Sequence, residues 1–153
     1  MARRYFDTSA FTKFYHPEVG SARVTAIVQD PASVLQISNL AILETQSAFA
    51  MKVRTAVLDQ AHAEAAMDKV FKDLAAGLFF AVKLDESHVD DARALVRKHG
   101  YARRMRTLDA LQLAVALDLR RRSLFDIFVV ADKLLAEIAV LEALVVENPE
   151  DAP

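Results

Sequence analysis

The chain contains no cysteine among its 153 residues. This absence excludes a disulfide framework, a thiolate zinc site and a cysteine nucleophile. The sequence also lacks any run that approaches the ~18 apolar residues of a membrane span, and the carboxylate of Asp7 interrupts the N-terminus before an apolar export signal could form. We therefore expect a cytoplasmic protein that makes no contact with membranes.

An excess of charge of one sign is lacking as well. The 19 lysines and arginines nearly balance the 21 aspartates and glutamates, so any contact with nucleic acid requires a local basic patch. The four histidines show none of the paired spacing of metal ligands, so we expect them at the surface or at helix ends. Hydrophobic residues make up 54% of the chain, which is typical of a folded protein with a substantial core.

Short apolar runs alternate with segments of helical periodicity along the chain. The apolar runs predict strands near residues 4–7, 34–37, 79–84, 127–130 and 144–146. The periodic segments predict helices near residues 10–15, 21–29, 39–54, 58–78, 87–99, 107–120 and 133–141, with Gly100 able to end the helix at 87–99 in the left-handed conformation. This alternation indicates an α/β fold with one domain over residues 1–147, in which a mainly parallel five-stranded sheet has helices on both faces. We expect the polar tail at residues 148–153 to fray.

Two aspartates directly follow predicted strands, Asp7 after the first and Asp132 after the fourth. Each residue taken alone would be interpreted as a helix N-cap. In an open parallel sheet, however, ligands bind at the carboxyl edge where the strand order reverses, so two aspartates from different strands can meet there. We expect a functional site at this edge.

Two further acids lie early in predicted helices. Asp109 lies in the first turn of an apolar helix, where the helix dipole favours an acid. Glu44 lies on a stripe that we expect to be buried, so a positive group should face it. That stripe consists of Leu40, Leu43, Ser47 and Met51. Four converging carboxylates would repel one another unless a hard divalent cation neutralised them, and all-oxygen ligation suits Mg²⁺ or Mn²⁺.

The four segments that carry these acids resemble the conserved blocks of PIN-domain ribonucleases. They are Tyr5–Tyr15, Ser38–Glu44, Leu108–Ala114 and Phe128–Leu135. The sequence is most similar to the VapC-like toxins of type II toxin–antitoxin systems, and the resemblance extends over nearly the whole chain.

The resemblance implies a Mg²⁺-dependent endoribonuclease, in which Mn²⁺ substitutes for Mg²⁺. The residues that match the catalytic and metal-binding acids of the family are Asp7, Glu44, Asp109 and Asp132. Ser9 matches a supporting hydroxyl that orients Asp7 or a metal-bound water. The resemblance further implies the strand order 3-2-1-4-5, a homodimer, and a VapB-like antitoxin as cognate partner.

A group of basic residues precedes the third of these acids. Arg103, Arg104 and Arg106 lead into Asp109, at the end of the helix where an RNA phosphate must approach the carboxylates. We predict that these arginines contact phosphates and that Tyr101 stacks on an unpaired base. Lys13, one short helix from Asp7, is a second candidate for substrate binding.

Three alternatives follow from the same residues. A haloacid-dehalogenase-type phosphatase would need a second aspartate where Ser9 stands, so the sequence argues against that class. Val130 stands where PIN-domain nucleases commonly have threonine or serine, which favours a single metal or a catalytically weak module that binds RNA or protein. A structure-specific DNA nuclease would use the same metal chemistry.

Overall fold

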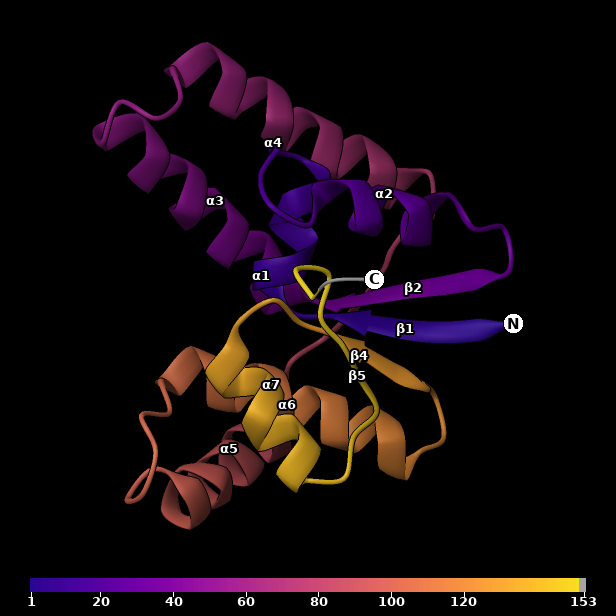
Figure 1. The fold of residues 1–153 in the computed structure, drawn as a ribbon, viewed down its shortest axis with the longest axis vertical. Coiled ribbons are helices and arrows are strands. Elements are labelled where there is room, and N and C mark those ends of the chain that lie inside the picture. Colours follow the sequence, from indigo (N-terminus) through magenta and orange to yellow (C-terminus); the bar gives the residue numbers. More distant parts are fainter. Residues whose placement is uncertain (152–153) are drawn as a thin grey trace.

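In the computed structural model, which describes residues 1–151, five strands form one parallel sheet in the order β3-β2-β1-β4-β5 (Figure 1). The strands are β1 (Ala2–Phe6), β2 (Ser33–Ser38), β3 (Phe80–Val82), β4 (Ile127–Val129) and β5 (Val146–Glu147). Every neighbouring pair in the sheet is parallel. The predicted fold class and strand order are therefore confirmed.

Helices cover both faces of this sheet. They are α1 (Thr8–Phe11), α2 (Ser21–Gln29), α3 (Asn39–Arg54), α4 (Gln60–Ala75), α5 (Glu86–His99), α6 (Thr107–Arg121) and α7 (Lys133–Leu141), with a 3₁₀ helix at Thr12–Phe14 after α1. In Figure 1, α2, α3 and α4 lie above the sheet, and α5, α6 and α7 lie below it. None of the helices within residues 1–151 combines the length and the apolar character needed to cross a membrane.

Alternating side chains of β1 fill two separate hydrophobic cores. Tyr5 packs with α5, α6 and α7, and its ring stacks on Phe128 at a centroid distance of 5.7 Å. Phe6 points to the opposite face, where it meets Phe79 edge-on at 5.7 Å. This alternation is the two-residue period of a strand that is buried on both faces.

The helix predicted at residues 58–78 is shorter in the structure. Asp59 caps the start of α4 by accepting a hydrogen bond from the backbone N–H of His62 at 2.8 Å. After the helix ends, Gly77 adopts a φ of +75°, which favours glycine because it has no Cβ. The strand β3 follows, and only three of its residues pair with β2.

Gly100 does not adopt the left-handed conformation that the sequence predicted. Its φ is −67°, so that prediction is wrong. The glycine is instead required by close approach, because a Cβ at this position would lie 2.6 Å from the carbonyl oxygen of Val96.

The stripe of α3 that we expected to be buried faces outward instead. Leu43 and Met51 are 67% and 50% exposed. The buried face of the helix consists of Ala41, Thr45 and Phe49, which lie on the opposite side. The small side chains of Ala41 and Thr45 let the helix approach the core closely, and the large ring of Phe49 fills it.

The described part of the C-terminal tail is packed rather than frayed. Asn148 is buried, and its Oδ1 atom accepts a hydrogen bond from the N–H of Glu150 at 2.9 Å. Glu150 in turn forms an ion pair with Lys13 at 2.6 Å. Residues 152 and 153 of the predicted tail lie outside the described residues.

Replacing Phe49 with alanine should lower the free energy of unfolding by about 3–5 kcal/mol, because the ring is fully buried and its removal leaves a cavity. Phe71→Ala is the matched control, since this phenylalanine of α4 is 54% exposed and should cost less than about 0.5 kcal/mol. Urea denaturation measures both values. Equal losses in the two variants would contradict the assignment of Phe49 to the core.

Candidate active site

Asp7 and Asp132 meet at the carboxyl edge of the sheet, where the strand order reverses. β1 pairs with β2 on one side and with β4 on the other, so the loops after β1 and β4 leave the sheet next to each other. The backbone N–H of Asp7 donates to the carbonyl oxygen of Val129 at 2.9 Å, which fixes this alignment. The structure thus brings together two acids that are 125 residues apart in the sequence (132 minus 7).

Asp7 is a buried carboxylate. Its Oδ2 atom accepts a hydrogen bond from the backbone N–H of Ser9 at 2.9 Å, which caps α1. Burial, together with the negative charges of Glu44 and Asp109, raises the pKa of Asp7 to about 6 against the opposing effect of hydrogen bonds from Ser9. Three of the predicted acids are therefore close enough for their charges to interact.

Ser9 ties the loop after β1 to the loop after β4. Its Oγ atom accepts hydrogen bonds from the backbone N–H groups of Ala131 at 3.0 Å and Asp132 at 3.1 Å. Because the two donors are the backbone N–H groups of Asp132 and the residue before it, the hydroxyl of Ser9 positions Asp132 relative to Asp7. The hydroxyl of Ser9 therefore holds the loop that carries Asp132, while its predicted role toward Asp7 or a metal-bound water stays a prediction.

Sequence reasoning missed a buried amide at the centre of the site, Gln112 of α6, which is 1% exposed. Its Oε1 atom accepts hydrogen bonds from the hydroxyls of Tyr5 at 2.6 Å and Ser38 at 3.0 Å. Its Nε2 atom donates to Thr8 Oγ1 at 2.9 Å and to Glu44 Oε1 at 2.8 Å. Burial raises the pKa of Tyr5, so its hydroxyl stays protonated as a donor. The only signal in the sequence was a glutamine within an otherwise apolar helix.

The partners of Glu44 differ from our prediction. We expected a positive group to face this acid, but its Oε1 atom accepts hydrogen bonds from two neutral groups, the Thr8 hydroxyl at 2.9 Å and the Gln112 amide. The prediction was wrong because Glu44 is only partly buried, so two hydrogen bonds and contact with water stabilise the charge without an ion pair.

Arg106 joins the other two acids. Its Nε atom lies 3.1 Å from Asp109 Oδ2, and a terminal guanidinium nitrogen lies 3.2 Å from Asp132 Oδ2. The hydrogen bond to Asp109 and the charges of the nearby aspartates raise the pKa of Arg106, so it remains positive. The guanidinium is therefore a bridge between a residue of α6 and the N-cap of α7.

The chemistry of the four acids suits a hard divalent cation, because all of them offer carboxylate oxygens. Within residues 1–151, however, no three acidic or histidine side chains are arranged to coordinate an ion as they stand. The contacts give the reason: Asp109 and Asp132 are directed to Arg106, and Glu44 is directed to Thr8 and Gln112. Coordination of a metal would require rotation of these carboxylates.

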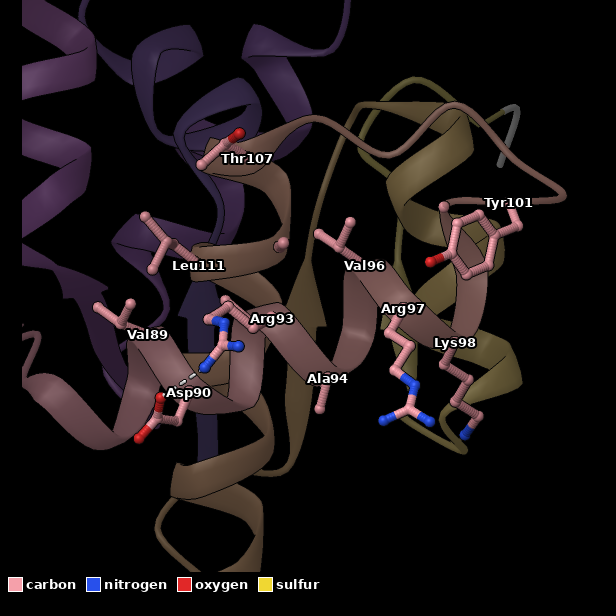
Figure 2. A pocket seen from close by; sticks show the side chains of 13 residues that line it. Val89, Asp90, Arg93, Ala94, Val96, Arg97, Lys98, Tyr101, Thr107 and Leu111 are labelled. Atoms are coloured by element: carbon pink, nitrogen blue, oxygen red, sulfur yellow. Dashed lines mark hydrogen bonds and ion pairs between the residues drawn. The ribbon is translucent and has the colours of Figure 1, made fainter.

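An open trough of about 940 Å³ lies between α5 and the start of α6 (Figure 2). Val89, Val96 and Leu111 supply apolar lining, and Arg93, Arg97 and Tyr101 add polar groups. Thr107, in the first turn of α6, also lines the trough and lies only two residues before Asp109. The trough therefore reaches the first turn of α6, the turn that carries Asp109, and its charged lining is Arg93, Arg97, Lys98 and Asp90.

The predicted basic residues have different surroundings. Arg103 and Arg104 are exposed, and neither forms an ion pair with another residue in the described part of the chain. Lys13 is 5% exposed, and its amino group pairs with Glu18 at 3.1 Å and Glu150 at 2.6 Å. Because two carboxylates already engage Lys13, the structure does not favour it as a phosphate ligand.

Two of the four histidines are buried, and both lie at the ends of α5, as the expected helix-end role predicts. His88 is 3% exposed and completes the capping box at the start of α5, as a helix-end role predicts. His99, at the last residue of α5, is 5% exposed and pairs with Glu142 at 2.6 Å. Neither contacts the four acids of the site.

Comparison with solved structures supports the fold. The chain is similar to a Mycobacterium tuberculosis toxin described as VapC20, a sarcin-ricin loop cleaving toxin, with 16% identity, a TM-score of 0.67, and coverage of 98% of this chain and 99% of that one. It is also similar to VapBC2 from Rickettsia felis bound to a DNA fragment from its promoter, with 11% identity, a TM-score of 0.65, and coverage of 95% and 98%. FitAcB from Neisseria gonorrhoeae gives 18% identity, a TM-score of 0.63, and coverage of 97% and 99%.

A comparison with curated proteins finds no match to the sequence. The family model described as the PIN domain matches residues 4–143. This range includes all four acids, most of β1 and the whole of β2, β3 and β4, and it ends before β5. Because this match covers most of its length, the chain belongs to the PIN-domain family.

Proposed function

We propose that the chain is a metal-dependent endoribonuclease and the toxin of a toxin–antitoxin pair. The observation that carries this proposal is the group of four carboxylates at the carboxyl edge of the sheet, in which Asp7 interacts with the charges of Glu44 and Asp109. Such a concentration of like charge raises the free energy of the folded chain unless it serves to bind a cation. Membership in the PIN-domain family supports nuclease chemistry at this edge.

Asp7, Glu44, Asp109 and Asp132 are the residues that would hold Mg²⁺, or Mn²⁺ in its place. When bound, such an ion makes a water molecule easier to deprotonate and stabilises the charge that develops on a phosphate during in-line attack.

The chain's own polar groups hold the acids in place for this chemistry. Ser9 keeps Asp132 beside Asp7 through the two N–H groups that it accepts. Gln112 fixes one oxygen of Glu44 with a donated hydrogen bond, and the other oxygen accepts no hydrogen bond within residues 1–151. Because these contacts fix the backbone and one carboxylate oxygen, only a few acidic side chains would need to rotate to bind the metal.

RNA is the substrate that the surroundings of the site favour. Arg103 and Arg104 are exposed close to the start of α6 in the sequence, where they can reach phosphates. The trough offers Tyr101, which is 91% exposed, as a surface on which an unpaired base can stack. Single-stranded RNA presents both phosphates and unpaired bases.

The partners that we propose are a VapB-like antitoxin and a second copy of the chain. The similar structures from Haemophilus influenzae and Klebsiella pneumoniae are described as VapBC-1 and as a toxin–antitoxin complex, which supports the antitoxin. Co-expression with the product of an adjacent small reading frame, followed by measurement of the mass of the purified complex, tests both partners.

Asp7→Asn should reduce cleavage of single-stranded RNA in Mn²⁺ by on the order of 10²-fold or more, because the amide keeps the shape but removes a charge that binds the cation. Gel analysis of a labelled RNA, with single-stranded DNA of the same sequence in parallel, measures the effect. Binding of RNA without any cleavage by the wild type would favour a catalytically weak module, to which Val130 already points, and preferred cleavage of DNA would favour the DNA nuclease.

The same variant should be more stable than the wild type above pH 6. Because the pKa of Asp7 is raised to about 6 in the folded chain, this group's stabilising contribution is present below about pH 4 and is lost as the pH rises through 6. The difference between the ordinary and the raised pKa corresponds to at most about 3 kcal/mol. Thermal unfolding in EDTA should show a gain for Asp7→Asn at pH 7.5 that shrinks toward pH 4.5. A gain of equal size at both pH values would contradict this account.

The double variant Arg103→Gln and Arg104→Gln should bind RNA more weakly and with a smaller salt dependence. If each arginine contacts one phosphate, the slope of log affinity against log salt concentration should fall by about 1.4. Asp7→Asn serves as the background because the RNA then remains uncut. Arg121→Gln and Arg122→Gln, at the other end of α6 and paired with Asp118, remove the same charge and should leave the slope unchanged.

A further inference from the structure

Arg106 occupies an unusual position for an exposed arginine. One guanidinium contacts two carboxylates that come from separate segments, Asp109 in the first turn of α6 and Asp132 at the start of α7. The contacts use different nitrogen atoms, so one planar group lies between the two acids.

The backbone at the start of α6 leaves the side chain of Arg106 free to contact the two acids. Arg106 is the N-cap residue of α6, with φ −81° and ψ 153°, and its side chain makes no capping hydrogen bond. An arginine cannot accept a bond from the helix N–H groups, so the residue contributes nothing to the cap that Ser, Thr, Asn or Asp would provide. We conclude that the contacts with the two acids, rather than the cap, account for an arginine here.

The charges explain what the contact does. Asp109, Asp132 and Asp7 all lie close enough to Arg106 for their charges to act on it, and like charges gathered in this way destabilise one another. A guanidinium is always ionised and offsets this repulsion. The same contact directs both carboxylates toward Arg106, which accounts for the lack of a ready-made ligand set among residues 1–151.

We propose that Arg106 is a built-in counter-ion of the acidic site, which occupies the space between Asp109 and Asp132 until a divalent cation displaces it. This inference rests on the proposed function, because it assumes that these acids bind a metal. The side chain of Arg106 is 62% exposed, so it can swing into solvent without unpacking the core. Binding of the metal is then an exchange of one cation for another, and the strength of the arginine contacts lowers the apparent affinity for the metal.

The proposal predicts that Arg106→Gln binds Mn²⁺ more tightly than the wild type does. Two partly exposed ion pairs must be broken in the wild type but not in the variant, so we expect an affinity roughly 3- to 10-fold higher. The free-ion signal of Mn²⁺ in electron paramagnetic resonance, measured without RNA at 150 mM salt, gives the dissociation constants. Thermal unfolding gives a second readout: in EDTA the variant should melt at a lower temperature than the wild type, and its gain on addition of Mn²⁺ should be larger.

Two further variants separate contact from general charge. Arg122→Gln removes the same charge at the other end of α6, roughly 20 Å along the helix, and should leave Mn²⁺ affinity within twofold of the wild type, since charge is screened beyond about 8 Å at this salt concentration. Arg106→Lys keeps the charge but cannot bridge two acids with a planar group, so its affinity should lie between those of the wild type and Arg106→Gln.

The outcomes distinguish the inference from the function on which it rests. If the wild type binds Mn²⁺ and Arg106→Gln binds it equally well or more weakly, the counter-ion role is wrong and the metal site stands. If Arg122→Gln tightens binding as much as Arg106→Gln does, the effect is one of net charge and the inference also fails. If neither the wild type nor Arg106→Gln binds Mn²⁺, both the inference and the proposed metal site are overturned.

Discussion

Repulsion among carboxylates is the constraint around which this end of the molecule is built. The fold places four acids, from the end of β1, α3, α6 and the start of α7, at one edge of a sheet. Burial and the charges of Glu44 and Asp109 raise the pKa of Asp7. The compensating contacts of the other three acids are of two kinds. Glu44 has neutral hydrogen-bond donors, whereas Asp109 and Asp132 share a guanidinium. Within the described chain, no single positive group therefore compensates the charges of all four acids.

The parallel pairing of β1 with β4 brings the residues of this site together. The register places Phe6 opposite Val129, so the residues that follow each strand emerge at the same level. Ser9 then joins the two loops through a pair of backbone N–H groups. The pairing of β1 with β4 and the two hydrogen bonds to Ser9 thus hold Asp7 and Asp132 close together, although they are far apart in the chain.

Much of the fold could be predicted from the sequence because its signals are local. Continuous apolar runs between helical segments indicate a parallel sheet, and an aspartate after a strand indicates its carboxyl edge. The positions of Asp7 and Asp132 follow from these two rules. The four blocks that resemble PIN-domain ribonucleases added Glu44 and Asp109 as members of the same group, and the structure shows their charges acting on Asp7.

The rest depends on packing that a linear pattern does not encode. Gln112 is one polar residue in an apolar helix, and only the folded chain shows that four polar groups from β1, α1, β2 and α3 converge on its amide. The burial of α3 was assigned to the wrong face because Ala41 and Thr45 carry little hydrophobic signal, although their small size is what permits close packing. The bridge made by Arg106 depends on the path of the loop before α6, which no periodicity predicts.

The sheet narrows sharply from its centre to its edges. β1 and β2 have five and six residues, whereas the edge strands β3 and β5 have three and two. An edge of two or three residues exposes few unpaired backbone groups, so it offers little template for an added strand from another chain. The helices and loops therefore supply most of the surface through which another protein could contact this chain, and the sheet edges supply little of it.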